Sequence, residues 1–319
     1  MRIYDFNNLI PNGLNYGGAA GKKIGVTIDG VDYMLKFPGN MRAKNIKNAV
    51  LSYSNGPVCE YLGSHIYEII GLPVHETLLG VRSGKIVVAC KDFRPQGGRL
   101  EHFSELKITC EEDFYDSTGN LTDGTGTDIV EIYNVIKQHP VLSAVDGVME
   151  RFWDMFVVDA LIGNPDRNNG NWGLIYKDHD ILGLAPIYDN GNCLFDKWSD
   201  EKILSWSKDK NMIDTIAYKS GTCTFTYLGR MMNPFKFIER ELYEECSEAI
   251  HRIVPKINMD KIDALFTEAR DCGVISPIQC NFYSQVLASR YENFMVPTYE
   301  KWFGRLEKTG DFSVGGPSL

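Results

Sequence analysis

The chain has 319 residues, which is long for one compact domain and sufficient for two lobes that share a cleft. Hydrophobic residues make up 44% of it and charged residues 24%, an ordinary globular composition that excludes disordered and fibrous proteins. The formal net charge of −9 argues against direct nucleic-acid binding, because a surface that neutralises phosphates needs an excess of Lys and Arg.

Neither targeting signals nor metal-binding cysteine patterns are found in the sequence. No run of about 18 apolar residues is present, so we expect no transmembrane helix and no membrane partner. The amino-terminal residues lack the apolar core of a signal peptide, and we expect a soluble, cytoplasmic protein, with delivery into a host cell left open. The eight cysteines form no C-x-x-C pair and no zinc-spaced Cys/His cluster. We therefore expect buried, reduced thiols and no protein-built metal cage.

Residues 1–95 have the pattern of a small lobe rich in β-strands. Apolar and polar residues alternate with period two on both sides of short turn sequences, which predicts hairpins. Apolar residues at helical spacing predict one helix between the hairpins. The predicted elements are a hairpin over 24–37 with its turn at Asp29-Gly30, a helix over 57–70 that ends at Gly71, and a hairpin over 74–90 with its turn at Ser83-Gly84.

Residues 96–319 have the pattern of a larger, mainly helical lobe. The polar stretch 99–128 contains Glu111-Glu112-Asp113 and predicts a surface insertion. A short hairpin is predicted over 172–184 with its turn at Asp178-His179, and residues 308–319 are expected to form a frayed tail. Helices are predicted over 129–137, 152–158, 235–253, 259–270 and 277–306. The expected fold class is α+β, with a small β-rich lobe followed by a helical lobe.

The segment 163–173 contains the strongest candidate for catalysis. Asp166 and Asn171 stand in the order Asp-x-x-x-x-Asn, the spacing of a kinase catalytic loop. In such a loop the Asp accepts the proton of the attacking hydroxyl group and the Asn binds a magnesium ion. Asp159 and Asn164 match the same spacing, but Asp159 falls in an apolar helical segment, where a structural carboxylate is expected. Asp166 instead lies among Pro, Gly and Asn, on a loop that can expose it.

A second candidate carboxylate, Asp189, follows the hairpin predicted over 172–184. Pairing of the two strands brings Asp189 back beside Asn171, where a second carboxylate ligand completes the metal-binding pair of a kinase. The alternative is a structural Asx turn, because Asp189 is followed by Asn190 and Gly191.

Three upstream features form a third candidate site. Gly17-Gly18-Ala19-Ala20-Gly21 is no Walker A loop, because its glycine spacing differs and no Ser or Thr follows the next lysine. Its small residues either let backbone N–H groups approach phosphates or form a plain flexible turn. Lys36 follows on the next hairpin strand and Glu60 lies inside the predicted helix. Each is most often a solvated side chain when taken singly, but this order matches the phosphate-binding lysine of kinases and its partner glutamate.

Five segments between about Asn15 and Leu194 together carry a family resemblance. They are Lys36-Phe37-Pro38, Glu60-Tyr61, Gly163-Asn164-x-Asp166-Arg167 through Asn171-Trp172-Gly173, Ala185-Pro186-Ile187-Tyr188-Asp189, and Val87 to Phe93. In these segments the chain resembles the HipA-like serine/threonine protein kinases, and among them the short, proinflammatory CtkA-type members. The resemblance is only loose over the carboxy-terminal helices.

The resemblance implies a bilobal protein-kinase-like fold that binds ATP and Mg²⁺ in its cleft. It implies a catalytic group of Asp166 as base with Lys36 and Arg167, and magnesium ligands Asn171 and Asp189. The implied nucleotide-binding residues are Gly17, Gly18, Gly21, Lys36 and Glu60, with a hinge at Cys90, Lys91, Asp92 and Phe93 that receives adenine through its backbone. The implied partners are a protein substrate with a Ser or Thr acceptor and an antitoxin-like protein.

The chain departs from the family pattern at two points. The family has His directly after the Asp-Arg of the catalytic loop, whereas this chain has Asn168, a neutral amide that makes different contacts. The serine of the family's phosphate loop, an autophosphorylation site, has no clear counterpart. Ser52 and Ser54 are the nearby hydroxyl groups.

Two other functions stay open at the level of sequence. A small-molecule phosphotransferase is built on the same two-lobed scaffold, and the acidic stretch 111–128 favours a cationic acceptor for such an enzyme. A catalytically degraded kinase that binds nucleotide or a partner is the other alternative. Asn168 favours the degraded kinase, whereas retention of Asp166, Asn171 and Asp189 argues against it.

Overall fold

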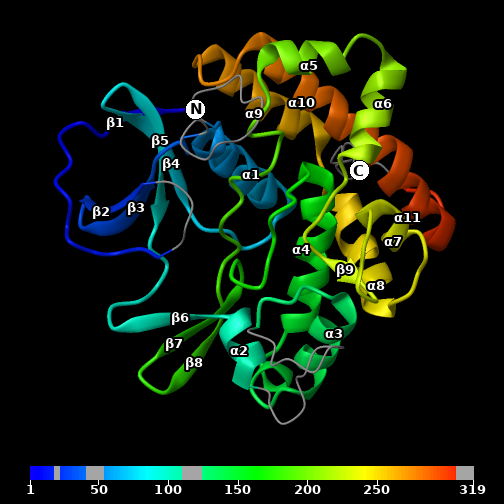
Figure 1. Cartoon of the computed structure of the whole chain (residues 1–319), viewed down its shortest axis with the longest axis horizontal. Coiled ribbons are helices and arrows are strands. Elements are labelled where there is room, and N and C mark those ends of the chain that lie inside the picture. Colours follow the sequence, from blue (N-terminus) through cyan, green and yellow to red (C-terminus); the bar gives the residue numbers. More distant parts are fainter. Residues whose placement is uncertain (18–21, 41–53, 110–123, 307–319) are drawn as a thin grey trace, which may run out of the picture.

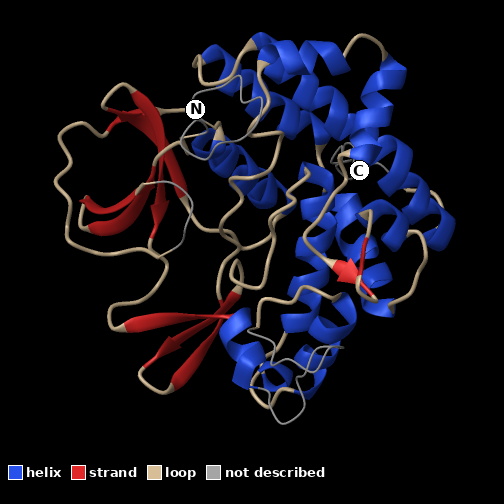
Figure 2. Cartoon of the chain, viewed as in Figure 1, coloured by secondary structure: helices blue, strands red, loops and turns tan. Residues whose placement is uncertain are grey.

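The computed structural model describes residues 1–17, 22–40, 54–109 and 124–306 (Figure 1). The predictions made for Gly18, Gly21, Ser52, the acidic residues 111–113 and the frayed tail 308–319 lie outside the described residues. Most strands gather on one side of the molecule and the helices on the other (Figure 2). The fold is α+β and bilobal, as the sequence predicts.

A five-stranded sheet forms most of the small lobe, with strand order β1-β4-β5-β3-β2. The short β1 runs parallel to β4, and the remaining neighbours are antiparallel. The strands are β1 (Ile3–Asp5), β2 (Lys23–Ile28), β3 (Val31–Lys36), β4 (Thr77–Arg82) and β5 (Lys85–Lys91). The sequence does not predict β1, because three residues are too few to show an alternating pattern.

Both hairpins predicted in this lobe are present, and both turn at the predicted dipeptides. Asp29 and Gly30 have φ values of 50° and 79°, and Ser83 and Gly84 have 52° and 70°. A left-handed φ at both central positions is typical of the tight turns whose twist matches that of the paired strands.

The sheet buries both of its faces, because successive side chains of a strand point to opposite sides. Val87 and Ala89 of β5 pack in a small outer cluster. Val88 and Cys90 of the same strand join the main core, together with helix α1 (Gly56–Ile70). Helix α1 ends at Gly71, whose φ is 86°, and lies between the sheet and the helical lobe (Figure 1).

A second sheet corrects the prediction that residues 99–128 form a surface insertion. Strand β6 (Gly98–His102) pairs with β7 (Gly173–Lys177), which pairs with β8 (Asp180–Leu184) in the predicted hairpin. Helix α2 (Phe103–Thr109) follows β6 and buries Phe103 against Trp172, with ring centroids 4.1 Å apart. The sequence does not predict β6 and α2, because only a few of their residues are apolar and face the core.

The large lobe is built around α4 (Val148–Ile162), which is buried along most of its length. Around it lie α3 (Ile129–Gln138), α5 (Asp200–Trp206), α6 (Lys210–Lys219), α7 (Pro234–Ile238), α8 (Glu244–Ile253), α9 (Met259–Asp271), α10 (Pro277–Arg290) and α11 (Val296–Phe303). A two-stranded ribbon of β9 (Thr226–Tyr227) and β10 (Arg230–Met231) completes the described part of this lobe.

No helix within the described ranges is long and apolar enough to cross a membrane.

Two long helices predicted from the sequence are interrupted in the structure. The helix predicted over 235–253 is divided into α7 and α8, because Glu241 adopts a left-handed φ of 52° that no α-helix accommodates. The helix predicted over 277–306 contains a π-helical turn at Tyr291–Met295. Pro297 follows this turn, and its missing N–H group removes one α-helical hydrogen bond from the segment.

Candidate active site

A cleft of about 340 Å³ lies where the five-stranded sheet faces the loops of the large lobe. Nearly half of its lining residues are ones the sequence singles out: Gly17, Lys36, Cys90, Lys91, Asp92, Phe93, Asn171 and Asp189. The other lining residues include Tyr16, Lys23, Met34, His75, Arg94, Leu100, His102 and Tyr188. The structure therefore brings together residues that are more than 150 positions apart in the chain.

Lys36 of β3 lies at the centre of the cleft and joins both lobes. Its Nζ donates to Oε2 of Glu60 at 2.7 Å and to Oδ1 of Asp189 at 2.8 Å. Glu60 comes from α1, and Asp189 comes from the loop after β8. A cation held between two carboxylates is well placed to receive the phosphates of a nucleotide.

The charges of this group reinforce one another. Burial opposes ionisation of Glu60, but Lys36 and His75 outweigh it and hold the pKa of this carboxyl well below its usual range. Burial likewise opposes protonation of Lys36, yet Glu60 and Asp189 raise its pKa well above the ordinary value. Both groups are therefore charged across the physiological pH range.

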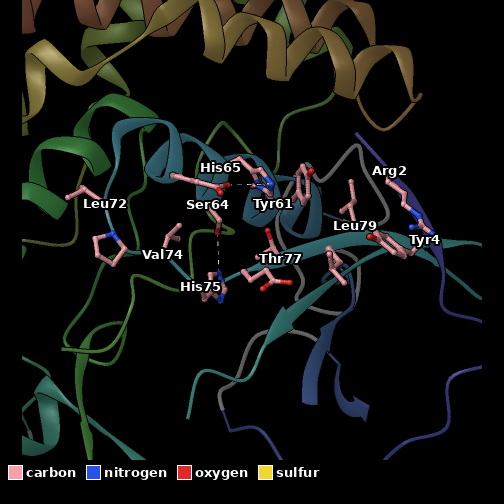
Figure 3. A pocket seen from close by; sticks show the side chains of 14 residues that line it. Arg2, Tyr4, Tyr61, Ser64, His65, Leu72, Val74, His75, Thr77 and Leu79 are labelled. Carbon is pink, nitrogen blue, oxygen red and sulfur yellow. Dashed lines mark hydrogen bonds and ion pairs between the residues drawn. The ribbon is translucent and has the colours of Figure 1, made fainter. Parts of the chain in front are cut away.

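His75, which the sequence analysis does not identify, contacts the Glu60 oxygen that Lys36 does not bind. The imidazole is 4% exposed, and its Nε2 lies 3.0 Å from Oε1 of Glu60 and 3.2 Å from Oγ of Ser64. Figure 3 shows His75 and Ser64 facing each other beneath α1. The amide of Asn190 completes the arrangement, because its backbone N–H donates to Glu60 and its side chain donates to Ser64.

Arg167, which the family resemblance places in the catalytic group, is buried beside the loop of Asp166. Its guanidinium is fully buried and donates to both carboxylate oxygens of Asp159, at 2.7 and 3.2 Å. It also donates to the backbone carbonyls of Asn171 and Tyr188. Like Asp166, Arg167 is not among the residues that line the cleft. Its hydrogen bonds tie the loop of Asp166 and Asn171 to the loop that carries Asp189.

Asp159, the second match to the Asp-x-x-x-x-Asn spacing, is a structural carboxylate as expected. It is buried in α4 and accepts hydrogen bonds from Tyr67 and Asn164 as well as from Arg167.

Asp166 lies exposed on the loop that follows α4. The side-chain amide of Asn192 donates to its Oδ2 at 2.8 Å. The surrounding protein displaces water from part of the carboxyl group and, together with the like charge of Asp189, raises the pKa of Asp166 above its ordinary value. A carboxylate with a raised pKa is a better proton acceptor than an ordinary one.

Asn171 and Asn168 shape the catalytic loop through their side-chain amides. Nδ2 of Asn171 donates to the carbonyl of Asp166 at 2.8 Å, which orients its Oδ1 as the remaining acceptor. Asn168, at the family's histidine position, accepts from the N–H of Gly170 at 2.9 Å and donates to the carbonyl of Asp166 at 3.1 Å. Asn168 thus closes the turn of the loop with two hydrogen bonds.

All four residues of the predicted hinge, from Cys90 to Phe93, line the cleft. The N–H of Lys91 donates to the carbonyl of Glu76, and the N–H of Asp92 donates to the carbonyl of Asp32, so both donors are occupied within the sheet. The Asp92 carboxylate accepts from Tyr16 and Arg94. Phe93 is the residue of this segment whose N–H has no partner within the described chain.

Two groups of side chains lie beside the cleft: Lys23, and a cluster of Glu60, His75 and Cys90. Nζ of Lys23 donates to the carbonyl of Gly17 at 2.8 Å, which fixes the start of the glycine-rich segment. Glu60, His75 and Cys90 place possible ligand atoms within 4.8 Å of one another. Lys36 already occupies the Glu60 carboxylate, so we assign no metal to this group.

Comparison with known proteins identifies the family. No protein-family model matches the chain. The serine/threonine-protein kinase CtkA of Helicobacter pylori is 36% identical over 258 residues, which cover 78% of this chain and 74% of that protein.

The crystal structure of a Helicobacter pylori proinflammatory kinase CtkA superposes with a TM-score of 0.82 at 30% identity, covering 94% of this chain and 97% of that one. HipA from a HipA–HipB–DNA complex of Shewanella oneidensis gives a TM-score of 0.44 at 12% identity, covering 92% and 70%, a likeness too distant to carry weight. The chain belongs to the HipA-like serine/threonine protein kinases of the CtkA type, and it is a protein kinase.

Proposed function

We propose that this kinase transfers the γ-phosphate of ATP to a Ser or Thr hydroxyl of a protein, with Asp166 as the base. The observation that carries the proposal is the convergence of Lys36, Glu60 and Asp189 at 2.7 and 2.8 Å. Phosphoryl transfer asks mainly for positioning and charge neutralisation, and this group supplies both next to a carboxylate on an exposed loop.

Each residue has one task in the proposed reaction. Lys36 binds the phosphates and Glu60 orients its ammonium group. Asp166 accepts the proton of the acceptor hydroxyl, and the raised pKa of its carboxyl favours that transfer. The free N–H of Phe93 receives the adenine ring. The lobe boundary then lies near residue 95, between the hinge and β6, with the small lobe over 1–95 and the large lobe over 96–319.

The donor atoms at the cleft suit a hard divalent cation such as Mg²⁺. Asp189 offers a half-exposed carboxylate from a residue with a left-handed φ of 60°, and Asn171 offers an amide oxygen. Oxygen ligands of this kind, completed by phosphate and water, are the ones that Mg²⁺ prefers. The cation, when bound, neutralises the charge of the phosphates, while Asp189 and Asn171 hold its position relative to Lys36.

Autophosphorylation is part of the proposal, with Ser52 and Ser54 as the candidate acceptors. The hydroxyl oxygen of Ser54 lies 3.3 Å from the N–H of Gly39, close to the carboxyl end of β3. The second hydroxyl considered, that of Ser52, lies outside the described residues.

Asp166→Asn tests the proposed base. We expect at least a hundredfold loss of phosphate transfer from radiolabelled ATP, because general base catalysis contributes about 10²- to 10⁴-fold. ATP binding measured by calorimetry in the presence of Mg²⁺ is expected to be unchanged. Asp178→Asn makes the same charge change at an exposed turn and serves as the control. Equal transfer by the wild-type and Asp166→Asn proteins would refute the assignment.

A further inference from the structure

A groove of about 510 Å³ lies on the large lobe, between the β9–β10 ribbon and α7. Three cations line it, Arg230, Lys236 and Arg240, and none of its lining residues is acidic. All three are exposed, and within the described residues none forms an ion pair. Such a concentration of positive charge is unexpected on a chain with a net charge of −9.

The groove also exposes large apolar side chains. Leu228 is 68% exposed and Met231 is 84% exposed, and both lie in the ribbon beside the cations. Phe237 of α7 forms a buried floor. Apolar side chains bordered by charges of a single sign are typical of a surface that binds another protein.

The turn of the ribbon provides an independent observation. Leu228 and Gly229 have φ values of 51° and 71°, so both central positions are left-handed. Asn or Gly is favoured at such a position, whereas Leu carries backbone strain as well as an exposed apolar side chain. Because backbone strain and an exposed apolar side chain both destabilise the protein, their occurrence at Leu228 indicates that this residue binds a partner rather than stabilising the fold.

The groove is tied rigidly to the catalytic loop. Asp128 caps α3 with one carboxylate oxygen and accepts from Thr226 and Gly229 of the ribbon with the other. Upstream of Asp128, the carbonyls of Gly124 and Gly126 accept from the side chain of Asn169 in the catalytic loop.

A second connection runs through Thr224, whose hydroxyl group donates to the carbonyl of Pro165, the residue before Asp166. From Thr224 to Tyr227 the extended chain spans about 10 Å. The groove therefore begins within a few residues of the reacting carboxylate.

We propose that this groove docks the substrate protein through a segment that combines acidic side chains with one apolar side chain. The inference rests on the proposed kinase function and specifies its substrate class. Acidic side chains pair with Arg230, Lys236 and Arg240, and the apolar side chain packs on Leu228 and Met231. The acceptor hydroxyl then lies a few extended residues away, at Asp166.

The test measures binding without ATP, so that it does not depend on catalysis. Fluorescently labelled peptides that share one Ser and one Leu but have acidic, neutral or basic flanks are titrated with the full chain, and anisotropy is recorded. We expect the acidic peptide to bind most tightly, with an affinity that falls as salt is added. Equal binding of the acidic and neutral peptides would overturn the proposal.

Two variants locate the site. Arg230→Glu/Arg240→Glu is expected to weaken binding of the acidic peptide by about tenfold or more, from the loss of two ion pairs and added repulsion. Lys202→Glu/Lys261→Glu makes the same charge change on α5 and α9 and is expected to bind like the wild type. Equal weakening by both double variants would overturn the proposal.

Leu228→Asn separates docking from folding. Asn relieves the strain of the left-handed turn, so we expect a higher melting temperature together with weaker peptide binding. Unchanged affinity would refute a contact at Leu228.

Oligomerisation and phosphate transfer provide two further tests. A concentration-dependent dimer that Arg230→Glu/Arg240→Glu dissociates would overturn the proposal in favour of a second copy of the chain. Acidic-peptide binding as predicted, with no phosphate transfer to the bound peptide or to any protein, would refute the proposed reaction but leave the docking groove in place.

Discussion

Two carboxyl groups of the active site lie in opposite electrostatic surroundings. Lys36 and His75 hold the pKa of Glu60 far below its usual range against the effect of burial. Burial and the nearby Asp189 raise the pKa of Asp166. Such a separation supports the proposed roles, in which Glu60 stays an anion that orients Lys36 and Asp166 accepts a proton.

His75 is predicted to act through Glu60, as a positioning residue. His75→Ala removes a buried donor at 3.0 Å from Glu60, and we expect kcat to fall about tenfold while the KM for ATP changes less. His75→Gln keeps an N–H donor near that position and is expected to restore most of the activity. His65→Ala, on the outer side of α1, is the control. A loss of activity in the Gln variant as large as that in the Ala variant would contradict the positioning role.

The sequence predicts the charged residues of the active site better than the residues that hold them in position. Lys36, Glu60 and Asp189 are recognisable because their order along the chain matches a known arrangement. His75 is not, because a lone histidine before a strand has no periodic or motif signal. Arg167 is recognised, but the sequence does not show that Asp159 and two backbone carbonyls surround its guanidinium.

At the scale of elements, the end of α4 determines where the catalytic loop begins. Gly163 ends the helix with a left-handed φ of 66°. A Cβ atom at this position would lie 2.6 Å from Nη1 of Arg290. Arg290 is itself buried, and it donates to the carbonyl of Leu161 near the end of α4 and to that of Ala217 in α6.

Gly163→Ala is predicted to destabilise the protein more than Gly147→Ala. Gly147 precedes the same helix with a φ of 79°, but a Cβ atom there would meet only Leu184 at 4.0 Å. Both variants carry backbone strain of about 1–2 kcal/mol, and Gly163→Ala adds displacement of a buried cation. We expect a further loss of about 1–2 kcal/mol in the free energy of unfolding, measured in urea. Equal losses of unfolding free energy in the two variants would show that the Arg290 side chain can move away from residue 163 without destabilising the protein.

Elements with a strong local signal are predicted well, and elements fixed by tertiary contacts are not. The hairpins at Asp29-Gly30 and Ser83-Gly84 follow from their turn residues. Helices α5 and α6 are missed because their composition is polar, although Ser199 and Asp209 cap them. Strand β6 is missed because its partner, β7, lies more than 70 residues away.

At the scale of the whole molecule, one buried carboxyl group makes stability depend on pH. Asp196 is 6% exposed, and burial raises its pKa to about 6, although Lys197 opposes the shift. Below a pH of about 4 the group is protonated in both the folded and the unfolded chain. As the pH rises, the unfolded chain loses its proton first, so the contribution of Asp196 to the free energy of unfolding falls between about pH 4 and pH 6 and stays lower above that range.

Asp196→Asn is therefore predicted to stabilise the protein near neutral pH. The expected gain is about 1–3 kcal/mol, the equivalent of a shift of roughly two pKa units. Near pH 4 the variant and the wild type are expected to unfold at similar urea concentrations. A gain that is the same at both pH values would mean that ionisation of Asp196 is not its cause.

His75 also separates two hollows of the molecule. It lines the active-site cleft and also a cavity of about 540 Å³ between α1 and β4, bordered by Tyr61 and Glu68 (Figure 3). An inhibitor bound in this cavity would contact the imidazole of His75 and would not need to resemble a nucleotide. Compounds directed at this cavity would therefore reach His75 from outside the active-site cleft.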